Sequence, residues 1–170
     1  VLPLIAIVPG LFLLNALGAH WQSVGSTVLT MVKGAPLVAA GFVISEALLI
    51  ALLVRGASRL VRPGWHSDEG PTACALWFSA QLKEASQGAL FPLYASVYTR
   101  SWLRLMGLKV GKRTEVSVAD GLNCLVTLGD TSFVADAPMF AAGRARNGWL
   151  HLAPIEVGSR TFVGNGALLT

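Results

Sequence analysis

Charged side chains are scarce in this chain. Asp, Glu, Lys and Arg make up 13% of its 170 residues, hydrophobic residues make up 54%, and the mean hydropathy is +0.61. A typical soluble domain has about 25% charged residues, so the composition argues against an ordinary cytosolic enzyme. It also excludes a disordered chain, because disorder requires low hydrophobicity and high charge.

Cysteine and histidine are also few. Cys74 and Cys124 stand among apolar or small neighbours without a C-x-x-C pair, and the three histidines are spread from His20 through His66 to His151. A zinc site needs three or four clustered ligands, so we predict no metal site and no disulfide framework, with both cysteines as buried thiols. A phosphate-binding loop motif is absent too.

Long apolar runs occupy the first third of the chain. Residues 1–19 contain no charge and residues 34–54 contain one, Glu46. A membrane span needs about 20 apolar residues, so the sequence predicts a transmembrane helical hairpin within residues 1–62, with a loop at residues 20–33. Glu46, an ionisable group inside a span, is either a functional polar site or a packing residue.

Basic residues follow the second run directly. Arg and Lys beside a span mark the cytoplasmic side, so we expect a multi-pass protein of the cytoplasmic membrane with its C-terminal part on the cytoplasmic face. Residues 55–113 carry a net charge of +6, against a formal +4 for the whole chain. The basic residues of this segment are Arg55, Arg59, Arg62, Lys83, Arg100, Arg104, Lys109, Lys112 and Arg113.

Residues 63–109 are predicted as a linker with interfacial amphipathic helices. Residues 63–71 are typical of turns, and residues 72–87 predict a helix with Leu76, Trp77, Ala80 and Ala85 as apolar contacts. From Pro92 to Met106, aromatic and apolar residues recur at helical spacing beside arginines, which is typical of a helix lying on a membrane surface. The lipid bilayer is therefore an expected partner; nucleic acid is not, because no recognition motif accompanies the charge.

From residue 110 an aliphatic residue recurs every six positions. Small residues often follow it, as in the hexapeptide pattern of a parallel β-helix, and hairpins would not explain the fixed period. We therefore predict a β-helix over residues 110–170, with a loop insertion at residues 140–156 that carries Arg144, Arg146, Trp149 and His151. The aliphatic positions are Val110, Val116, Leu122, Leu128, Val134, Val157, Val163 and Leu169.

The repeats resemble those of left-handed β-helix acyltransferases, including the lead-in WLRLMGLKVGK at residues 102–112. The order of hairpin, basic segment and repeats resembles the C-terminal membrane module of nonribosomal peptide synthetases similar to ε-poly-lysine synthetase. The motifs that carry this resemblance are LGDTSF at residues 128–133 and VGSRTFVGN at residues 157–165. Since the chain starts at Val1 and ends inside a repeat, we expect it to be a piece of a longer protein.

The resemblance implies amide-bond formation. An aminoacyl thioester on the phosphopantetheine arm of an upstream carrier domain, loaded by an adenylation domain, is attacked by an amine. It also implies a histidine near Met139–Phe140, which this chain lacks. His151 is the remaining candidate for the base, with Arg144 and Arg146 as substrate contacts. Asn165 either orients an amine or closes a turn, and the same two alternatives hold for Asp130 and Asp136.

Three interpretations stay open. The chain is a catalytic acyltransferase-like module, or it is a non-catalytic module that anchors and orients an active sister β-helix domain or a second copy. In the third, the hairpins line an exit path for a polymer, with Glu46 as a pore residue.

Overall fold

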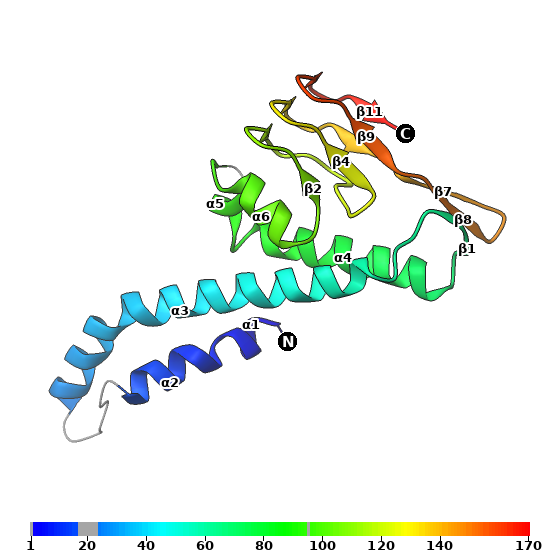
Figure 1. Ribbon diagram of the computed structural model, residues 1–170. Helices are drawn as coiled ribbons and strands as arrows, with labels where there is room; N and C mark the ends of the chain where they lie inside the picture. Colours follow the sequence, from blue (N-terminus) through cyan, green and yellow to red (C-terminus); the bar gives the residue numbers. More distant parts are fainter. Residues whose placement is uncertain (1, 17–23, 95) are drawn as a thin grey trace. The chain divides into compact units, whose positions relative to one another are not determined.

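The computed structural model describes residues 2–16, 24–94 and 96–170, with side chains described outside residues 2 and 24–31. It divides into two compact units, Val1–Ile50 and Ala51–Thr170. The predicted interfacial residue His20 lies outside the described residues. Figure 1 shows helices in the first unit and a helical and stranded second unit, which we describe separately.

The first unit contains helices α1 (Leu2–Ala6) and α2 (Val8–Ala16) and most of α3 (Val24–Ser58). A Cβ atom at Gly10 would lie 2.9 Å from Cγ1 of Val38, and one at Gly41 would lie 3.2 Å from Cδ1 of Leu13, so α2 and α3 pack closely. The predicted loop at residues 20–33 is wrong from Val24 onward, because α3 already begins there.

Among the described residues, one helical segment is long and apolar enough to cross a membrane, Val32–Ser58. The apolar helical stretch Pro3–Ala16 is shorter than a span. Glu46 lies on α3 and is buried, and its Oε2 has no hydrogen-bond partner among the described residues. The transmembrane hairpin therefore stays a prediction.

Helix α4 (Pro71–Gln87) confirms the helix predicted over residues 72–87, with Pro71 in its first turn as expected for a helix start. The predicted apolar contacts are wrong for Trp77, which is 65% exposed, and for the exposed Ala80 and Ala85, whereas Leu76 is half-buried. Cys74, predicted as buried, is exposed on the same helix. The buried positions of α4 are instead mostly small or hydroxylated: Thr72, Ala75, Ser79, Leu82 and Ser86.

The single helix predicted from Pro92 to Met106 is wrong. It is broken into α5 (Phe91–Tyr94) and α6 (Thr99–Leu105). Ser96 and Thr99 explain the break: the Thr99 hydroxyl donates to the Ser96 carbonyl (2.7 Å) and accepts from the Ser96 amide (3.1 Å). Such local bonds compete with helical ones. Trp102 and Met106, expected on a membrane surface, are buried in the second unit.

Three small parallel sheets follow. The first contains β2 (Lys109–Val110), β4 (Val126–Leu128) and β9 (Ile155–Val157). The second contains β3 (Glu115–Val116), β5 (Phe133–Val134) and β10 (Phe162–Val163). The third pairs β6 (Met139–Phe140) with β11 (Leu168–Leu169).

The register of these sheets follows the six-residue repeat. Val110 pairs with Leu128 and Val116 with Val134, in each case 18 residues later in the chain, as three hexapeptides require. All the repeated aliphatic side chains except Leu169 are buried, which confirms their predicted inward position. Figure 1 shows β2, β4 and β9 side by side.

The predicted loop insertion is a β-hairpin. Strands β7 (Gly143–Arg146) and β8 (Trp149–Leu152) pair antiparallel, and β1 (Gly64–Ser67) joins β8 as a third strand. Residues 64–67 were predicted as part of a turn-rich linker. The sequence GWHS is too short to show the alternating pattern of a strand. It forms a strand here because β8 of the hairpin has a free edge with which it pairs.

Candidate functional site

A cavity of about 360 Å³ lies within the second unit, between the helices and the first turn of strands. Helix α4 contributes Lys83 and Glu84, and the segment after β3 contributes residues 117–122, including Asp120. Tyr94 of the short helix α5 also lines the cavity. This size suits a single amino-acid-sized ligand, since ligand pockets start at about 300 Å³.

Lys83 is the cation of this cavity and is half-buried. Its Nζ donates a hydrogen bond to the carbonyl oxygen of Leu122, which ties α4 to the first turn of strands. Burial lowers the pKa of Lys83 from 10.5 to about 8, a shift that Cys124 partly opposes. A lysine with such a pKa is partly neutral near pH 8, so its amine is able to accept a proton.

Tyr94 lines the cavity, and its hydroxyl is held by Ser86, which is buried behind it. Their hydroxyl oxygens are 2.7 Å apart, and the ring of Tyr94 meets that of Trp102 edge-on, with centroids 5.9 Å apart. Burial raises the pKa of Tyr94, and its hydrogen bonds oppose this shift. Tyr94 therefore stays protonated at neutral pH and keeps a hydroxyl that donates or accepts.

The cavity presents both signs of charge. Glu84 and Asp120 line it and are exposed, whereas Lys83 is mostly covered. No ion pair joins these three side chains within the described part of the chain. Carboxylates at an open rim favour a ligand that brings an ammonium group, and a partly neutral lysine deeper inside favours proton transfer from it.

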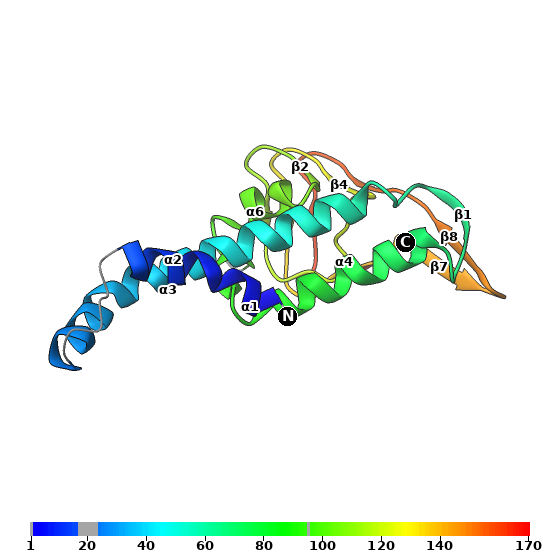
Figure 2. The same ribbon diagram turned by 90° about the horizontal axis from the view of Figure 1, so that it is seen from below.

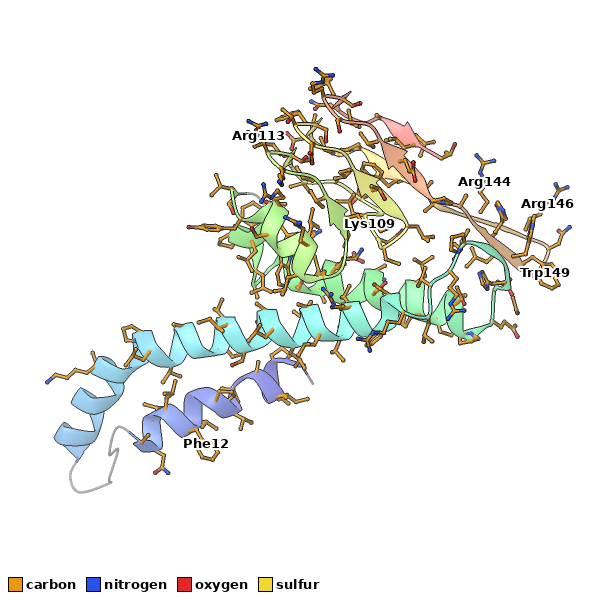
Figure 3. The ribbon with its side chains drawn as sticks, viewed as in Figure 1. Phe12, Lys109, Arg113, Arg144, Arg146 and Trp149 are labelled. Carbon is orange, nitrogen blue, oxygen red and sulfur yellow. The ribbon has the colours of Figure 1, made fainter. Side chains whose placement is uncertain are left out.

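His151, the predicted base, lies elsewhere. It occupies β8 opposite Trp65 of β1 and Arg144 of β7, so these three side chains share one face of the hairpin sheet. The rings of Trp65 and His151 are 4.6 Å apart. Figure 3 shows Arg144, Arg146 and Trp149 projecting from the hairpin, and none of these residues lines the Lys83 cavity. The structure thus brings His151 and Arg144 together, on an open face.

Asn165 is not grouped with the hairpin residues. Its Oδ1 accepts the amide of Asp136 (3.1 Å), 29 residues earlier, so Asn165 links the turn between β10 and β11 to the turn after β5 and does not close its own turn through this bond. Asp130 acts alike, because its Oδ1 accepts the amide of Lys112 (2.7 Å). His66 lies on β1, with its Nε2 2.8 Å from the Arg62 carbonyl oxygen.

Sequence reasoning missed Lys83, Tyr94 and Asp120. Lys83 was counted only as part of the basic segment. A signal existed: it is the first charge after the uncharged stretch 71–82, and it shares the buried side of α4 with Ser79 and Ser86. The cavity itself joins residues from separate segments, which no local pattern reveals.

Comparison with known proteins gives one informative match. The chain is similar to delta-poly-L-ornithine synthetase from Acinetobacter baumannii (strain AB307-0294), with 37% identity in an alignment of 127 residues that covers 72% of this chain and 10% of that protein. The chain is homologous to part of a poly-amino-acid synthetase. It spans about a tenth of this relative's length. No protein-family model and no solved structure matches it.

This homology supports the coarser of our predictions, a role in peptide or polyamide synthesis. The finer resemblance to ε-poly-lysine synthetase stays a prediction.

Proposed function

We propose that this chain is part of a membrane-anchored, acyltransferase-like module of a poly-amino-acid synthetase that forms amide bonds. The observation that carries the proposal is the similarity to delta-poly-L-ornithine synthetase, which covers 72% of the chain. The name of that relative describes a polymer of amino acids, and the resemblance of the repeats to acyltransferases supplies the reaction class.

The proposed architecture is a left-handed parallel β-helix behind a transmembrane hairpin. Three parallel sheets support the β-helix, since each hexapeptide then forms one wall. The pairings β2–β4 and β3–β5 join residues 18 apart, and the pairings β4–β9, β5–β10 and β6–β11, which span the hairpin insertion, join residues 29 apart. The apolar segment Val32–Ser58 supports the anchor. Arg55, Arg59 and Arg62 at its end support a cytoplasmic location for the β-helix.

Helix α4 gives separate support for contact with lipid. Its buried side is rich in small and hydroxylated residues, and the hydroxyls of Ser79 and Ser86 bond back to the carbonyls of Leu76 and Lys83 (2.9 and 2.7 Å). Its exposed side carries Trp77 and Phe78. Membrane helices pack through small residues in this way and turn their large apolar residues to lipid.

We assign the proton transfer to Lys83. An ammonium group held by the rim carboxylates of Glu84 and Asp120 loses a proton to the Lys83 amine, and the freed amine attacks the carbonyl carbon of a thioester. The C–N bond forms and the C–S bond breaks; the nitrogen gives up its second proton as it becomes an amide, and the leaving thiolate takes up that proton. The thioester itself is substrate delivered on the phosphopantetheine arm of a carrier domain, and adenylation and carrier domains are the proposed partners.

A second candidate is the architectural module, in which this copy orients an active sister domain or a second copy. The observation that favours it is the open position of His151, which faces Trp65 on the surface of the hairpin sheet instead of lining the cavity.

The test uses the full-length protein that contains this chain, with thioester loading and polymer formation measured separately. Lys83→Met is expected to load normally and to lose about a hundredfold or more in polymer formation, as loss of a general base does. His151→Ala is the matched variant and is expected to retain polymer formation. Loss of polymer formation in His151→Ala, with Lys83→Met still active, would identify His151 on the hairpin as the base. Activity in both variants would favour the architectural module.

A further inference from the structure

A second pocket lies where helix α3 ends. It has a volume of about 520 Å³ and is formed by the last turn of α3, the residues after it and the outer face of the β2–β4–β9 sheet, all within the second unit. Its polar side chains come from Arg55, Ser58, Arg59, Lys109, Thr127 and Glu156.

The charge of this pocket is strongly one-sided. Arg55, Arg59 and Lys109 line it, against the single acid Glu156. Within the described ranges, none of the three cations forms an ion pair. Three positive charges around one pocket repel each other, and an anion bound in the pocket offsets that repulsion.

The cations also have free donors. Among the described residues, the side chain of Arg55 makes one hydrogen bond, from Nη1 to the Leu105 carbonyl at 3.5 Å, which is long, and a guanidinium has five N–H donors. The forked geometry of these donors matches two oxygens of a phosphate. Lys109 adds a point charge from β2, on a different element from the two arginines.

The position of the pocket is fixed by local packing. Gly107 has φ +97, in the left-handed region, and a Cβ atom there would lie 3.7 Å from Cγ of Arg55. The stem of Arg55 therefore lies against the turn that leads from α6 into β2. The Cys124 thiol donates to the Ser58 carbonyl (3.7 Å), which joins the end of α3 to the loop before β4.

We propose that this pocket binds a phosphate ester, the headgroup phosphate of an anionic phospholipid. Arg55 and Arg59 stand at the C-terminal end of the one described apolar segment long enough to span a bilayer, where headgroup phosphates lie next to such a helix. The phosphate site follows from the charges and donors alone. Its lipid source rests on the membrane anchor proposed above and is independent of amide-bond formation.

The test is native mass spectrometry of the full-length protein, released from micelles that contain equal amounts of phosphatidylglycerol and phosphatidylcholine. The wild type is expected to retain phosphatidylglycerol preferentially. Arg55→Gln with Lys109→Gln should lower that preference about tenfold or more, because charge-assisted bonds are lost. The control variant, Arg144→Gln with Arg146→Gln, removes the same charge from the hairpin, which Figure 3 shows apart from Lys109.

Equal loss in both double variants would mean general electrostatic attraction and would overturn the site. Unchanged preference in both would overturn it as well. In a second arm, glycerol phosphate is titrated without lipid: binding that depends on Arg55 and Lys109, with no lipid preference, would keep the phosphate site and reject the lipid source. Polymer formation is measured on the same variants, so that failure of the proposed synthetase activity is seen separately.

Discussion

At the residue scale, glycine at the corners of the strand turns is explained by close approach of the backbone. A Cβ atom at Gly129 would lie 2.5 Å from the amide nitrogen of Ser159 in the next turn. Gly158 holds the equivalent place one turn later, and the nearest atom to its Cβ position is Oγ1 of Thr161 at 3.5 Å. The small residue predicted after each aliphatic one is therefore required at Gly129 but not at Gly158.

Gly129→Ala is expected to lower the free energy of unfolding of this chain by about 1–3 kcal/mol, the usual cost of overpacking. Gly158→Ala should have a much smaller effect. Thermal unfolding of the two variants, followed by circular dichroism, provides the comparison. Equal stability of the two would contradict the stacking of these corners.

Lys83 should make stability depend on pH. Its pKa is about 8 in the folded chain, below its ordinary 10.5, so between these values the unfolded chain binds more protons. The free energy of unfolding should then rise with pH across that window. In Lys83→Met this part of the rise should be missing. Denaturant unfolding at pH 7.5, 9 and 10 measures the difference, and parallel pH profiles would show that the Lys83 pKa is not lowered.

At the element scale, α4 was predictable in its bounds but not in its orientation. A helix was predicted over residues 72–87 with Trp77 among its apolar contacts, yet the structure exposes Trp77 and buries the side that carries the hydroxyl groups. The break at Ser96–Thr99 and the strand β1 were not predictable, because both depend on which partners reach these residues. In Figure 2 helices α3 and α4 are seen from below.

The exposed side of α4 is expected to face lipid. Cys74 is exposed one turn before Trp77, so a nitroxide label there, with Cys124→Ala as background, reports on that side. In reconstituted vesicles we expect high accessibility to oxygen and low accessibility to a water-soluble nickel reagent. Low accessibility to both would indicate a protein partner, and high accessibility to nickel would contradict contact with lipid.

At the scale of the whole molecule, the six-residue period predicted the strand positions and the inward side chains well. It did so because parallel strands repeat the same environment after three hexapeptides, 18 residues later before the hairpin and 29 residues later across it. The hairpin sheet and the Lys83 cavity escaped prediction, since both join segments that are distant in sequence. The predicted site at His151 and Arg144 is a real grouping, but it lies on an open face.

The central claim is that this chain works within a synthetase that joins amino acids through amide bonds. Mass spectrometry of the product made by the full-length protein, supplied with ATP and single amino acids, tests it most directly. We expect a ladder of polymers separated by one amino-acid residue mass, which disappears with Lys83→Met while thioester loading persists. A protein that loads no amino acid and makes no polymer with any of them would contradict the account.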